Sequence, residues 1–464
     1  MGLFEREPLK QAPIVNNHDN ISYFRFKLKL VNKNDHAKYW LRTEEAMDET
    51  RHEISCRCCI AGGGPAGMML GLLLARAGVD TVVVEKHKDF LRDFRGDTIH
   101  PSTLEALHDL GLLDDFLKLP HQKATLLEGK VGDVTIPLAD FSHLPTHAKF
   151  IVFMPQWDFL NFIAAQAKRY PGFRLFMSTA ADGLLMEQDR VAGITASSRN
   201  RKLTIRAGLT IGADGRHSLV REEAGFEPQE IGAPMDVLWF RLSRYNEDPL
   251  ETFGRIEAGQ MLILINRGEH WQCGYVIAKG SIHRLKAQGI EKLRENITEL
   301  APFLGDRPFE LRSFDDVKLL TVTVDRLTTW HKPGLLCIGD AAHAMSPVGG
   351  VGINLAIQDS IAAANLLCGV LAGTEPVPDE ALARVQARRE WPVKVTQMIQ
   401  VFIQRRVISR VLGDGGKIKP PWIVRLFIYF PVLRRLPAGL IGIGVRPERV
   451  TSPARANPAV TDHC

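Results

Sequence analysis

The pattern of apolar and polar positions becomes regular near Ile54, where an apolar run leads into a glycine turn at 62–64. Residues 65–77 then have the apolar spacing of a helix, and Gly78 follows as a helix-ending residue. A second apolar run occupies 81–85. This succession predicts a strand, a helix and a second strand, which form the βαβ unit that opens many α/β folds.

The same signals recur further along the chain. Helical spacing of apolar residues predicts helices at 102–110, 156–169, 352–370 and 380–411. Strand-like apolar runs predict strands at 173–178, 183–195, 202–211 and 335–338.

Residues 232–320 have a different character. Three strand-like runs separated by turns lie there, at 237–242, 261–266 and 271–277. They predict a mostly antiparallel sheet inserted into the α/β body. The alternation of side chains does not decide which face of that sheet His270, Trp271 and Tyr275 occupy.

These boundaries predict the domain organisation. The parts are a discontinuous α/β domain at 51–231 and 321–375, a β-sheet at 232–320, a C-terminal helix at 376–412, and a basic, aromatic-rich tail at 413–464. Part of 120–155 is assigned either to the α/β domain or to the sheet. Residues 1–50 are predicted to be a poorly ordered extension, with a short strand at 23–31 as the alternative.

Length and charge narrow the class of protein. At 464 residues the chain is long enough for two domains, and its composition is that of a folded globular protein. Segment 404–455 carries eleven Lys and Arg against two acidic residues, Asp414 and Glu448, so its net charge is +9. Since the whole chain has a net charge of +5, the remainder has a net charge of −4. A general nucleic-acid-binding surface is therefore not expected.

The seven cysteines are an odd number, and Cys56, Cys58 and Cys59 lie in or beside the first predicted strand. They give neither a disulfide framework nor the spacing of a zinc site. We expect reduced, structural cysteines, no metal site and a cytoplasmic protein. The uncharged run 58–75 has the length of a membrane helix, but its glycines and Pro65 interrupt it, so we interpret it as strand, turn and helix.

The tail between 420 and 445 combines large apolar side chains with isolated arginines. Arg425, Arg434 and Arg435 interrupt the apolar run and Pro431 breaks a helix, so the segment cannot span a bilayer. One interpretation is an amphipathic segment that makes weak contact with an anionic membrane surface. The other, which is favoured, is a lid whose apolar side chains pack over the body.

Gly62, Gly64 and Gly67 form a Gly-x-Gly-x-x-Gly motif between the first strand and the first helix, and Glu85 ends the next strand. Such glycines permit a tight turn and a close approach of the backbone to a pyrophosphate, which then lies at the helix N-terminus. Glu85 is placed to accept hydrogen bonds from the ribose hydroxyls of an adenosine. The motif predicts a dinucleotide site without distinguishing NAD from FAD.

Two further glycine motifs follow predicted strands. The first reads Gly-Ala-Asp-Gly-Arg-His-Ser at 212–218 and by itself is equally compatible with a simple turn. The second reads Gly-Asp-Ala-Ala-His at 339–343 and continues as Ser-Pro-Val-Gly-Gly-Val-Gly-Ile-Asn at 346–354. Asp340 can bind a polyol hydroxyl, and the glycine turn directs a helix N-terminus at whatever lies above it. His343 is expected to support this turn.

Together the three motifs resemble those of class A FAD-dependent monooxygenases of the para-hydroxybenzoate hydroxylase and ubiquinone-biosynthesis hydroxylase type, over nearly all of 54–412. The resemblance implies an α/β fold in which a Rossmann-type FAD-binding domain carries an inserted, mostly antiparallel β-sheet substrate domain. The FAD contacts that it implies are Gly62, Gly64, Pro65, Ala66, Gly67, Glu85 and Lys86 on the adenosine and pyrophosphate side, and Arg95, Gln156, Asp214, Gly339, Asp340, Gly352, Ile353 and Asn354 on the ribityl and flavin side. Pro347, Gly350 and Gly352 would border the isoalloxazine ring, in a site without an acid or base residue.

The activity implied by the resemblance is hydroxylation of a lipophilic small molecule that is aromatic, quinone-like or polycyclic. NAD(P)H would be the transient electron donor, O2 the oxidant and a flavin C4a-hydroperoxide the oxygen-transferring species. No second Gly-x-Gly-x-x-Gly motif follows residue 100, so no separate nicotinamide-binding domain is expected. The alternatives are an FAD-dependent reductase or dehydrogenase without oxygen insertion and a flavin-binding protein without turnover. A flavin halogenase is disfavoured because a Trp-x-Trp-x-Ile-Pro segment is absent.

Overall fold

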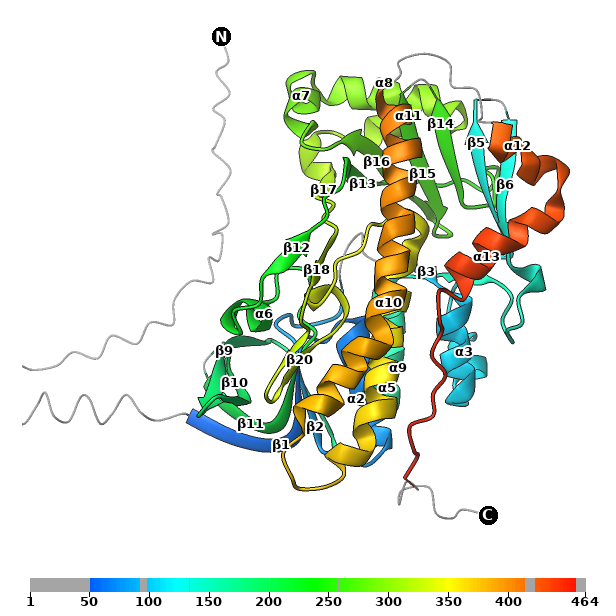
Figure 1. Ribbon diagram of the computed structural model, residues 1–464. Helices are drawn as coiled ribbons and strands as arrows, with labels where there is room; N and C mark the ends of the chain where they lie inside the picture. Colours follow the sequence, from blue (N-terminus) through cyan, green and yellow to red (C-terminus); the bar gives the residue numbers. More distant parts are fainter. Residues whose placement is uncertain are drawn as a thin grey trace, which may run out of the picture. The chain divides into compact units, whose positions relative to one another are not determined.

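The computed structural model describes residues 51–91, 98–132, 134–199, 201–257, 259–413 and 422–455 (Figure 1). The predicted extension with its alternative strand at 23–31 lies outside these residues, as does Arg95. From Arg51 onward the chain forms one compact unit that contains two large sheets. The division of this unit into an FAD-binding and a substrate domain stays a prediction.

Parallel strands form the centre of the larger sheet. β1 (Arg51–Ala61) pairs with β2 (Thr81–Val84) and with β11 (Arg201–Gly212), β2 pairs with β8 (Phe173–Phe176), and β11 pairs with β20 (Leu335–Cys337). With β19 (His331–Lys332) the strand order is β19-β20-β11-β1-β2-β8. The last four residues of β1 are buried in the core of this sheet.

The segment predicted as one strand at 183–195 is a hairpin, so that prediction is wrong. β9 (Thr179–Glu187) and β10 (Arg190–Ser198) pair antiparallel. Between them Gln188 has a φ of 54°, the left-handed conformation that a tight hairpin turn requires. Such turns usually contain Gly or Asn, so this one gave no recognisable turn signal.

Three apolar helices pack together beside the larger sheet. α2 (Pro65–Arg76) packs against α9 (Val351–Leu371) and α5 (Gln156–Ala167), and α9 packs against α10 (Asp379–Ile403) (Figure 1). Among the described residues one helical segment, Val348–Leu371, is long and apolar enough to cross a membrane. The most apolar stretch of 18 residues in this segment is 72% buried inside the protein, which is typical of a core helix.

The second large sheet has seven strands in the order β17-β13-β16-β15-β14-β5-β6. Their bounds are β5 (Leu126–Val131), β6 (Val134–Asp140), β13 (Met235–Ser243), β14 (Phe253–Glu257), β15 (Gln260–Asn266), β16 (His270–Ala278) and β17 (Lys318–Leu320). All neighbours are antiparallel except β14 and β5. The three strands predicted in this region are β13, β15 and β16, whereas β14 and β17 were not predicted.

The two faces of this sheet have different neighbours. One face packs against α7 (Ile282–Ala287) and α8 (Ile290–Leu300) in a core that includes Trp271 and Tyr275. Trp239 and Gly274 are paired across β13 and β16, and they occupy the opposite face because adjacent residues of a strand point to opposite sides. Trp271 and Tyr275 are therefore core residues.

The helix predicted at 380–411 is interrupted near its C-terminal end. α10 continues through one π-helical turn, Gln404–Ile408, into α11 (Ser409–Gly413). The wider turn carries the buried side chain of Gln404, whose amide donates a hydrogen bond to the hydroxyl of Ser346.

The tail packs on the body through one of its faces. α12 (Trp422–Tyr429) is followed by a 3₁₀ turn, Pro431–Arg434, and by α13 (Arg435–Gly442), which lies beside β6 (Figure 1). Ala438 is fully buried. A Cβ atom on Gly442 would lie 2.9 Å from Leu144, so α13 is in close contact with the loop after β6. This packing agrees with the lid interpretation of the tail.

The remaining short elements connect the sheets. They are β3 (Thr98–Ile99), α3 (Pro101–Asp109), α4 (Leu113–Phe116), β4 (Gln122–Ala124), η1 (Phe141–His143), β7 (Ile151–Phe153), α6 (Leu219–Glu223), β12 (Pro228–Glu230), η2 (Pro302–Leu304), η3 (Arg307–Glu310), η4 (Phe314–Asp316), β18 (Asp325–Leu327), η5 (Gly339–Ala341) and η6 (Val348–Gly350). Six of the seven cysteines lie in the described part of the chain, and all six are free thiols.

Candidate cofactor and active site

The three glycine motifs meet where β1, β11 and β20 end, because these parallel strands are neighbours. Gly62 has a φ of +107°, and a Cβ atom there would lie 2.3 Å from the carbonyl oxygen of Ala213. A Cβ atom on Gly339 would lie 3.2 Å from the Cβ of Ala66. The first motif therefore touches both of the others, and their backbones are as close as their atoms permit.

The N-terminus of α2 faces open space. Gly64 is the N-cap residue. Among the residues that the structure describes, no side chain caps the helix, and a Cβ atom on Gly64 would meet nothing within 4 Å. Glu85 braces the turn, since its carboxylate accepts hydrogen bonds from the backbone N–H of Gly63 at 2.9 Å and of His87 at 3.0 Å. An uncapped helix N-terminus with free space in front of it fits the pyrophosphate of FAD.

Asp340 is paired with a residue of the second motif. Its Oδ2 accepts a hydrogen bond from Nε of Arg216 at 3.0 Å. The side chains of Arg216 and Asp340 are 25% and 33% exposed, so this ion pair is accessible from outside the protein. The carboxylate predicted to hold ribityl hydroxyls is thus present and oriented.

Asp214 has a different environment from the one predicted. Its carboxylate accepts hydrogen bonds from the hydroxyl of Ser218 and, at 3.2 Å, from the backbone N–H of Val220, which holds the start of α6. Burial raises the pKa of Asp214 above its usual value, although these hydrogen bonds oppose the shift. Both oxygens serve the protein itself, and contact of Asp214 with FAD stays a prediction.

The glycine turn before α9 is fastened to the segment that precedes α3. Gly350 has a φ of +64°, and a Cβ atom there would lie 2.3 Å from the hydroxyl of Thr98. The side chain of Asn354 accepts from the backbone N–H of His100 and from the hydroxyl of Thr103, both at 2.8 Å, and donates to the carbonyl of Thr98 at 3.1 Å. Asn354 therefore fixes the shape of the turn that was predicted to border the flavin.

A buried charge network lies behind the Gly339–Ala341 turn. Asp359 accepts hydrogen bonds from the backbone N–H of Gly339 at 3.1 Å, from Nε2 of His343 at 2.7 Å and from Nε of Arg389 at 3.0 Å. Burial alone would raise the pKa of Asp359, but His343 and Arg389 hold it below its usual value. His343 thus supports the turn, as its position in the motif indicated.

The other residues predicted to contact FAD are spread around these turns. Pro65 and Ala66 open α2, Lys86 is exposed after β2, and Gln156 is buried at the start of α5. The structure gives the three remaining residues, Pro347, Gly352 and Ile353, positions in or beside the turn that opens α9.

The sheet face that carries Trp239 lies toward the predicted flavin turn. Trp239 packs against an apolar cluster that also includes Val348 of the turn. A Cβ atom on Gly274 would lie 3.2 Å from the indole ring, so this glycine leaves room for the ring. The buried Nε1 of Trp239 has no hydrogen-bond partner among the described residues. This donor was not predicted from the sequence, because the alternation does not identify the faces.

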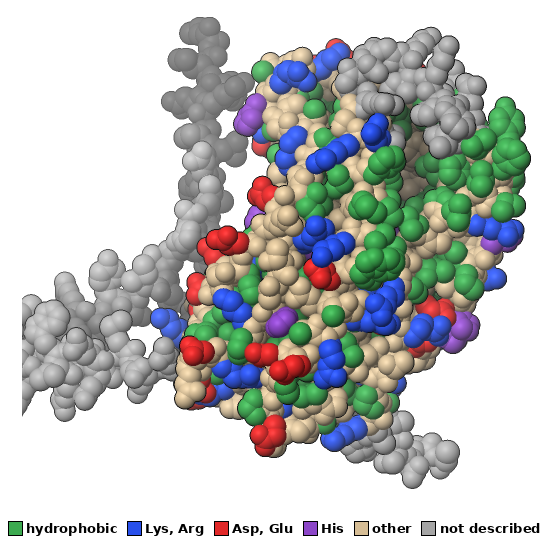
Figure 2. Space-filling view, viewed as in Figure 1, with side chains coloured by type: hydrophobic (Ala, Val, Ile, Leu, Met, Phe, Trp, Pro, Cys, Tyr) green, Lys and Arg blue, Asp and Glu red, His purple; other side chains and the backbone are tan. Residues whose placement is uncertain are grey.

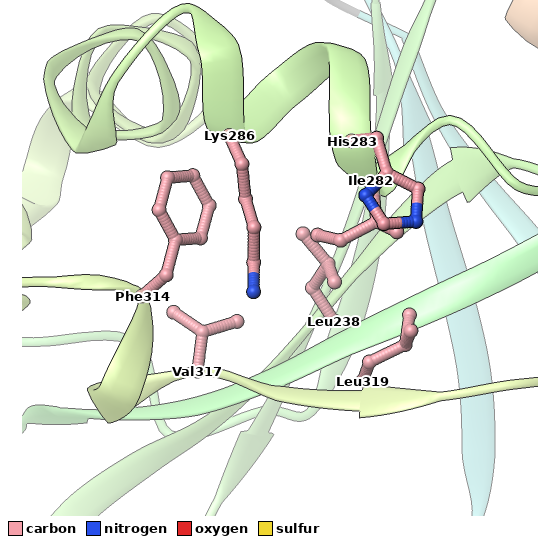
Figure 3. Close-up of a pocket in the computed structure, with 7 residues that line it drawn as sticks. All are labelled: Leu238, Ile282, His283, Lys286, Phe314, Val317 and Leu319. Carbon is pink, nitrogen blue, oxygen red and sulfur yellow. The ribbon is translucent and has the colours of Figure 1, made fainter.

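A small pocket of about 170 Å³ lies on the opposite face of the sheet (Figure 3). Its lining residues are Leu238, Ile282, His283, Lys286, Phe314, Val317 and Leu319. Leu238 belongs to the core under α7 and α8, so the pocket is separated from the glycine turns by the sheet itself.

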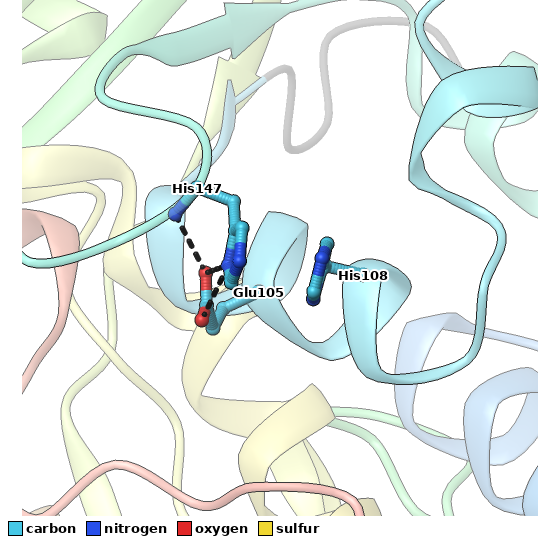
Figure 4. Close-up of side chains that lie close together, drawn as sticks. All are labelled: Glu105, His108 and His147. Carbon is cyan, nitrogen blue, oxygen red and sulfur yellow. Dashed lines mark hydrogen bonds and ion pairs between the residues drawn. The ribbon is translucent and has the colours of Figure 1, made fainter.

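In the described part of the chain one group of side chains has the composition of a metal site, Glu105, His108 and His147 (Figure 4). Glu105 Oε1 lies 3.0 Å from Nδ1 of His147 and 3.0 Å from Nη1 of Arg449. The two imidazole rings are stacked 3.4 Å apart and therefore do not point at a common centre. Because Arg449 already neutralises the carboxylate, the cluster joins the C-terminal segment to α3 as an ion pair.

Comparisons with known proteins agree with this site. Residues 55–395 match the family described as FAD binding domain. The chain is 31% identical over 404 residues to the 6-methylpretetramide 4-monooxygenase of Streptomyces rimosus, covering 84% of this chain and 94% of that protein. It is 25% identical over 409 residues to the ubiquinone hydroxylase UbiL of Rhodospirillum rubrum, covering 84% and 91%. The solved structure of the anhydrotetracycline hydroxylase OxyS from Streptomyces rimosus shares the fold, with a TM-score of 0.65 at 23% identity over 84% of this chain and 76% of that one.

The chain therefore belongs to the FAD binding domain family and is an FAD-dependent oxidoreductase of the monooxygenase type. The predicted family, α/β fold and FAD cofactor are confirmed.

Two alanine substitutions distinguish a glycine that leaves room for the cofactor from a glycine that is required for packing. Gly67→Ala would place Cβ 1.9 Å from the carbonyl oxygen of Gly62, so we expect loss of stability. Gly64→Ala meets no atom of the described residues, so we expect an unchanged melting temperature of the apoprotein and FAD affinity weakened at least ten-fold. Thermal unfolding and flavin titration measure both. Equal FAD affinity of Gly64→Ala and wild type would mean that the pyrophosphate does not lie there.

Protonation of His100 should destabilise the protein in acid. Burial lowers the pKa of His100 to about 4, and Nδ1 contacts the carbonyl oxygen of Ile441 at 2.7 Å. The unfolded chain takes up this proton near pH 6.5, so stability is lost as the pH falls from 6.5 toward 4.

We expect the wild type to lose about 2 kcal/mol more than His100→Asn between pH 7 and pH 5, with other titrations common to both. Urea unfolding at the two pH values measures this difference. Parallel losses in the two proteins would show that His100 is not held neutral.

Proposed function

We propose that the protein hydroxylates an aromatic, quinone-like or polycyclic small molecule with NAD(P)H as electron donor. The overall reaction consumes one NAD(P)H, one proton and one O2, places one oxygen atom on the substrate and releases the other as water. Bound FAD supplies the activation of oxygen. The observation that carries the proposal is the convergence of three glycine motifs near a sheet face whose buried donor, the indole N–H of Trp239, has no partner in the described part of the chain.

The protein's own residues divide the work between binding and enclosure. The N-terminus of α2 would hold the pyrophosphate, and Asp340 would accept hydrogen bonds from the ribityl hydroxyls. The N-terminus of α9 would supply backbone N–H groups that stabilise negative charge on a bound flavin. The seven-stranded sheet and α13 keep water from the site.

The substrate class follows from the sheet face. Apolar side chains near Trp239 include Ile263 and Ile265, which suits a flat, lipophilic ring system. The indole N–H of Trp239 is buried without a partner among the described residues, so it is a donor for a carbonyl or phenolic oxygen of such a substrate. Two relatives support this class, because their names give 6-methylpretetramide and ubiquinone as the compounds concerned.

Hydroxylation is tested by supplying polycyclic phenols and quinones with NADH or NADPH to the FAD-loaded protein. We expect a substrate to accelerate NAD(P)H oxidation and to gain one oxygen atom that derives from isotopically labelled O2. Trp239→Phe should raise the KM for that substrate by roughly ten-fold, since it removes one hydrogen bond and keeps the ring.

Substrate oxidation without incorporation of labelled oxygen would instead establish a dehydrogenase or reductase. Retention of FAD with no NAD(P)H oxidation in the presence of any candidate would leave a flavin-binding protein without turnover.

We also propose that this cytoplasmic enzyme makes weak contact with anionic membranes through the outward face of its tail. Tyr429, Phe430, Val432 and Leu436 are exposed there, and Figure 2 displays hydrophobic side chains gathered over α12 and α13. The neighbouring Arg435 is also exposed. Apolar side chains beside a cation suit the interface of an anionic bilayer, from which a lipophilic substrate could be drawn.

Vesicle flotation tests the membrane contact. We expect the wild type to float with vesicles that contain phosphatidylserine, to float less at high salt, and to stay behind with phosphatidylcholine alone. Replacing Phe430 and Leu436 by Ser should abolish flotation, whereas Phe309→Ser, which alters an exposed aromatic in the sheet region, should not. Absence of the wild type from the lipid fraction in all conditions would remove the membrane contact and leave the lid.

A further inference from the structure

Arg216 joins the second and third glycine motifs across 124 positions of the sequence. Its Nε donates to Oδ2 of Asp340 at 3.0 Å, and its Nη2 donates to the carbonyl oxygen of Met345 at 3.2 Å. Arg221 reinforces the joint by donating to the carbonyl oxygens of Arg216 at 2.6 Å and of Ala341 at 3.4 Å. The guanidinium is therefore held in one orientation by two groups of the segment 340–345.

One part of this guanidinium remains unused. Nη1 is buried and has no hydrogen-bond partner among the described residues, although Nε and Nη2 are both bonded. Leaving a charged donor buried without a partner is costly, so such a group in a fixed frame indicates an acceptor that is supplied from outside the chain.

The position of Arg216 identifies the kind of acceptor. Two residues before it, Asp214 has its Cα 2.8 Å from where a Cβ of Gly62 would lie, so the loop rests on the pyrophosphate turn. A pyrophosphate carries about two negative charges, whereas a helix N-terminus supplies about half a positive charge. A fixed guanidinium beside the turn would provide the missing cation and, through Nη1, a donor for a phosphate oxygen.

We propose that Arg216 is a cofactor-binding residue that uses Nη1 to hold a phosphate or ribityl oxygen of FAD while Nε orients the carboxylate of Asp340. The inference rests on the FAD-binding role proposed for Asp340. It assigns a role in FAD binding to the side chain of Arg216, a residue of the second glycine motif. NAD(P)H carries the same phosphate chemistry, so the experiment has to distinguish the two dinucleotides.

The test is FAD titration of the apoprotein, followed by fluorescence, for wild type, Arg216→Ala and Arg216→Lys. We expect Arg216→Ala to weaken FAD binding about ten- to a hundred-fold and Arg216→Lys to weaken it less, because a lysine keeps the charge without the planar fork. Arg201→Ala, an exposed arginine at the start of β11, is the matched control and should bind as wild type does.

A double-mutant cycle with Asp340→Asn separates direct contact from positioning. If Nη1 contacts FAD, Arg216→Ala weakens binding further in the Asp340→Asn background. No further loss in that background would mean that Arg216 acts only through Asp340 and would overturn the direct contact. Unfolding of each apoprotein checks that the fold persists, and Arg216→Lys carries the test if the alanine variant does not fold.

Two other outcomes also overturn the proposal. One is wild-type FAD affinity in Arg216→Ala, and the other is an increase confined to the KM for NAD(P)H, which would assign the donor to the nicotinamide dinucleotide. Failure of hydroxylation with intact FAD binding in the wild type would count against the proposed function and leave this inference unaffected.

Discussion

The constraint on which the structure depends is the contact between the backbones of the first two glycine motifs. β1 and β11 are parallel neighbours, so the chain leaves both strands at the same edge of the sheet. Gly62 then passes so close to Ala213 that no side chain fits between them. The same contact fixes the direction of α2. Gly67 of this helix touches Gly62, and Ala66 lies against Gly339. These contacts bring the three glycine motifs together around one cofactor site.

Buried charges behind the Gly339–Ala341 turn hold this part of the site in position. Asp359 bonds the Gly339 turn to Arg389 of α10, and Arg389 donates to the carbonyl oxygen of Arg446 in the C-terminal segment at 3.3 Å. Breaking one partner of such a buried pair leaves an uncompensated charge, which costs about 3–5 kcal/mol. The position of Asp340 therefore depends on residues that never reach the cofactor, and the C-terminal segment contributes to the site from outside it.

Much of this site could be predicted because it is encoded in short motifs. Glycine spacing beside apolar runs specified the strand, turn and helix of the first motif, and the order of the three motifs specified the family. The missing parts depend on contacts between distant segments. Nothing in the sequence near Arg216 or Asp359 reveals that they pair with Asp340 and Arg389. Asp214 and Asn354 stand in motif positions, yet their side chains are engaged by the protein itself. The side of the sheet on which Trp239 lies required the register of β13 and β16.

The central claim is that segments 62–67, 212–216 and 339–343 form one FAD site. Hydrogen exchange of the apoprotein and of the FAD-bound protein, resolved by peptide, tests it most directly. The account predicts that FAD slows exchange in all three segments together and leaves α8, beyond the second sheet, unchanged. Protection confined to the first segment, with 212–216 and 339–343 exchanging as in the apoprotein, would contradict it.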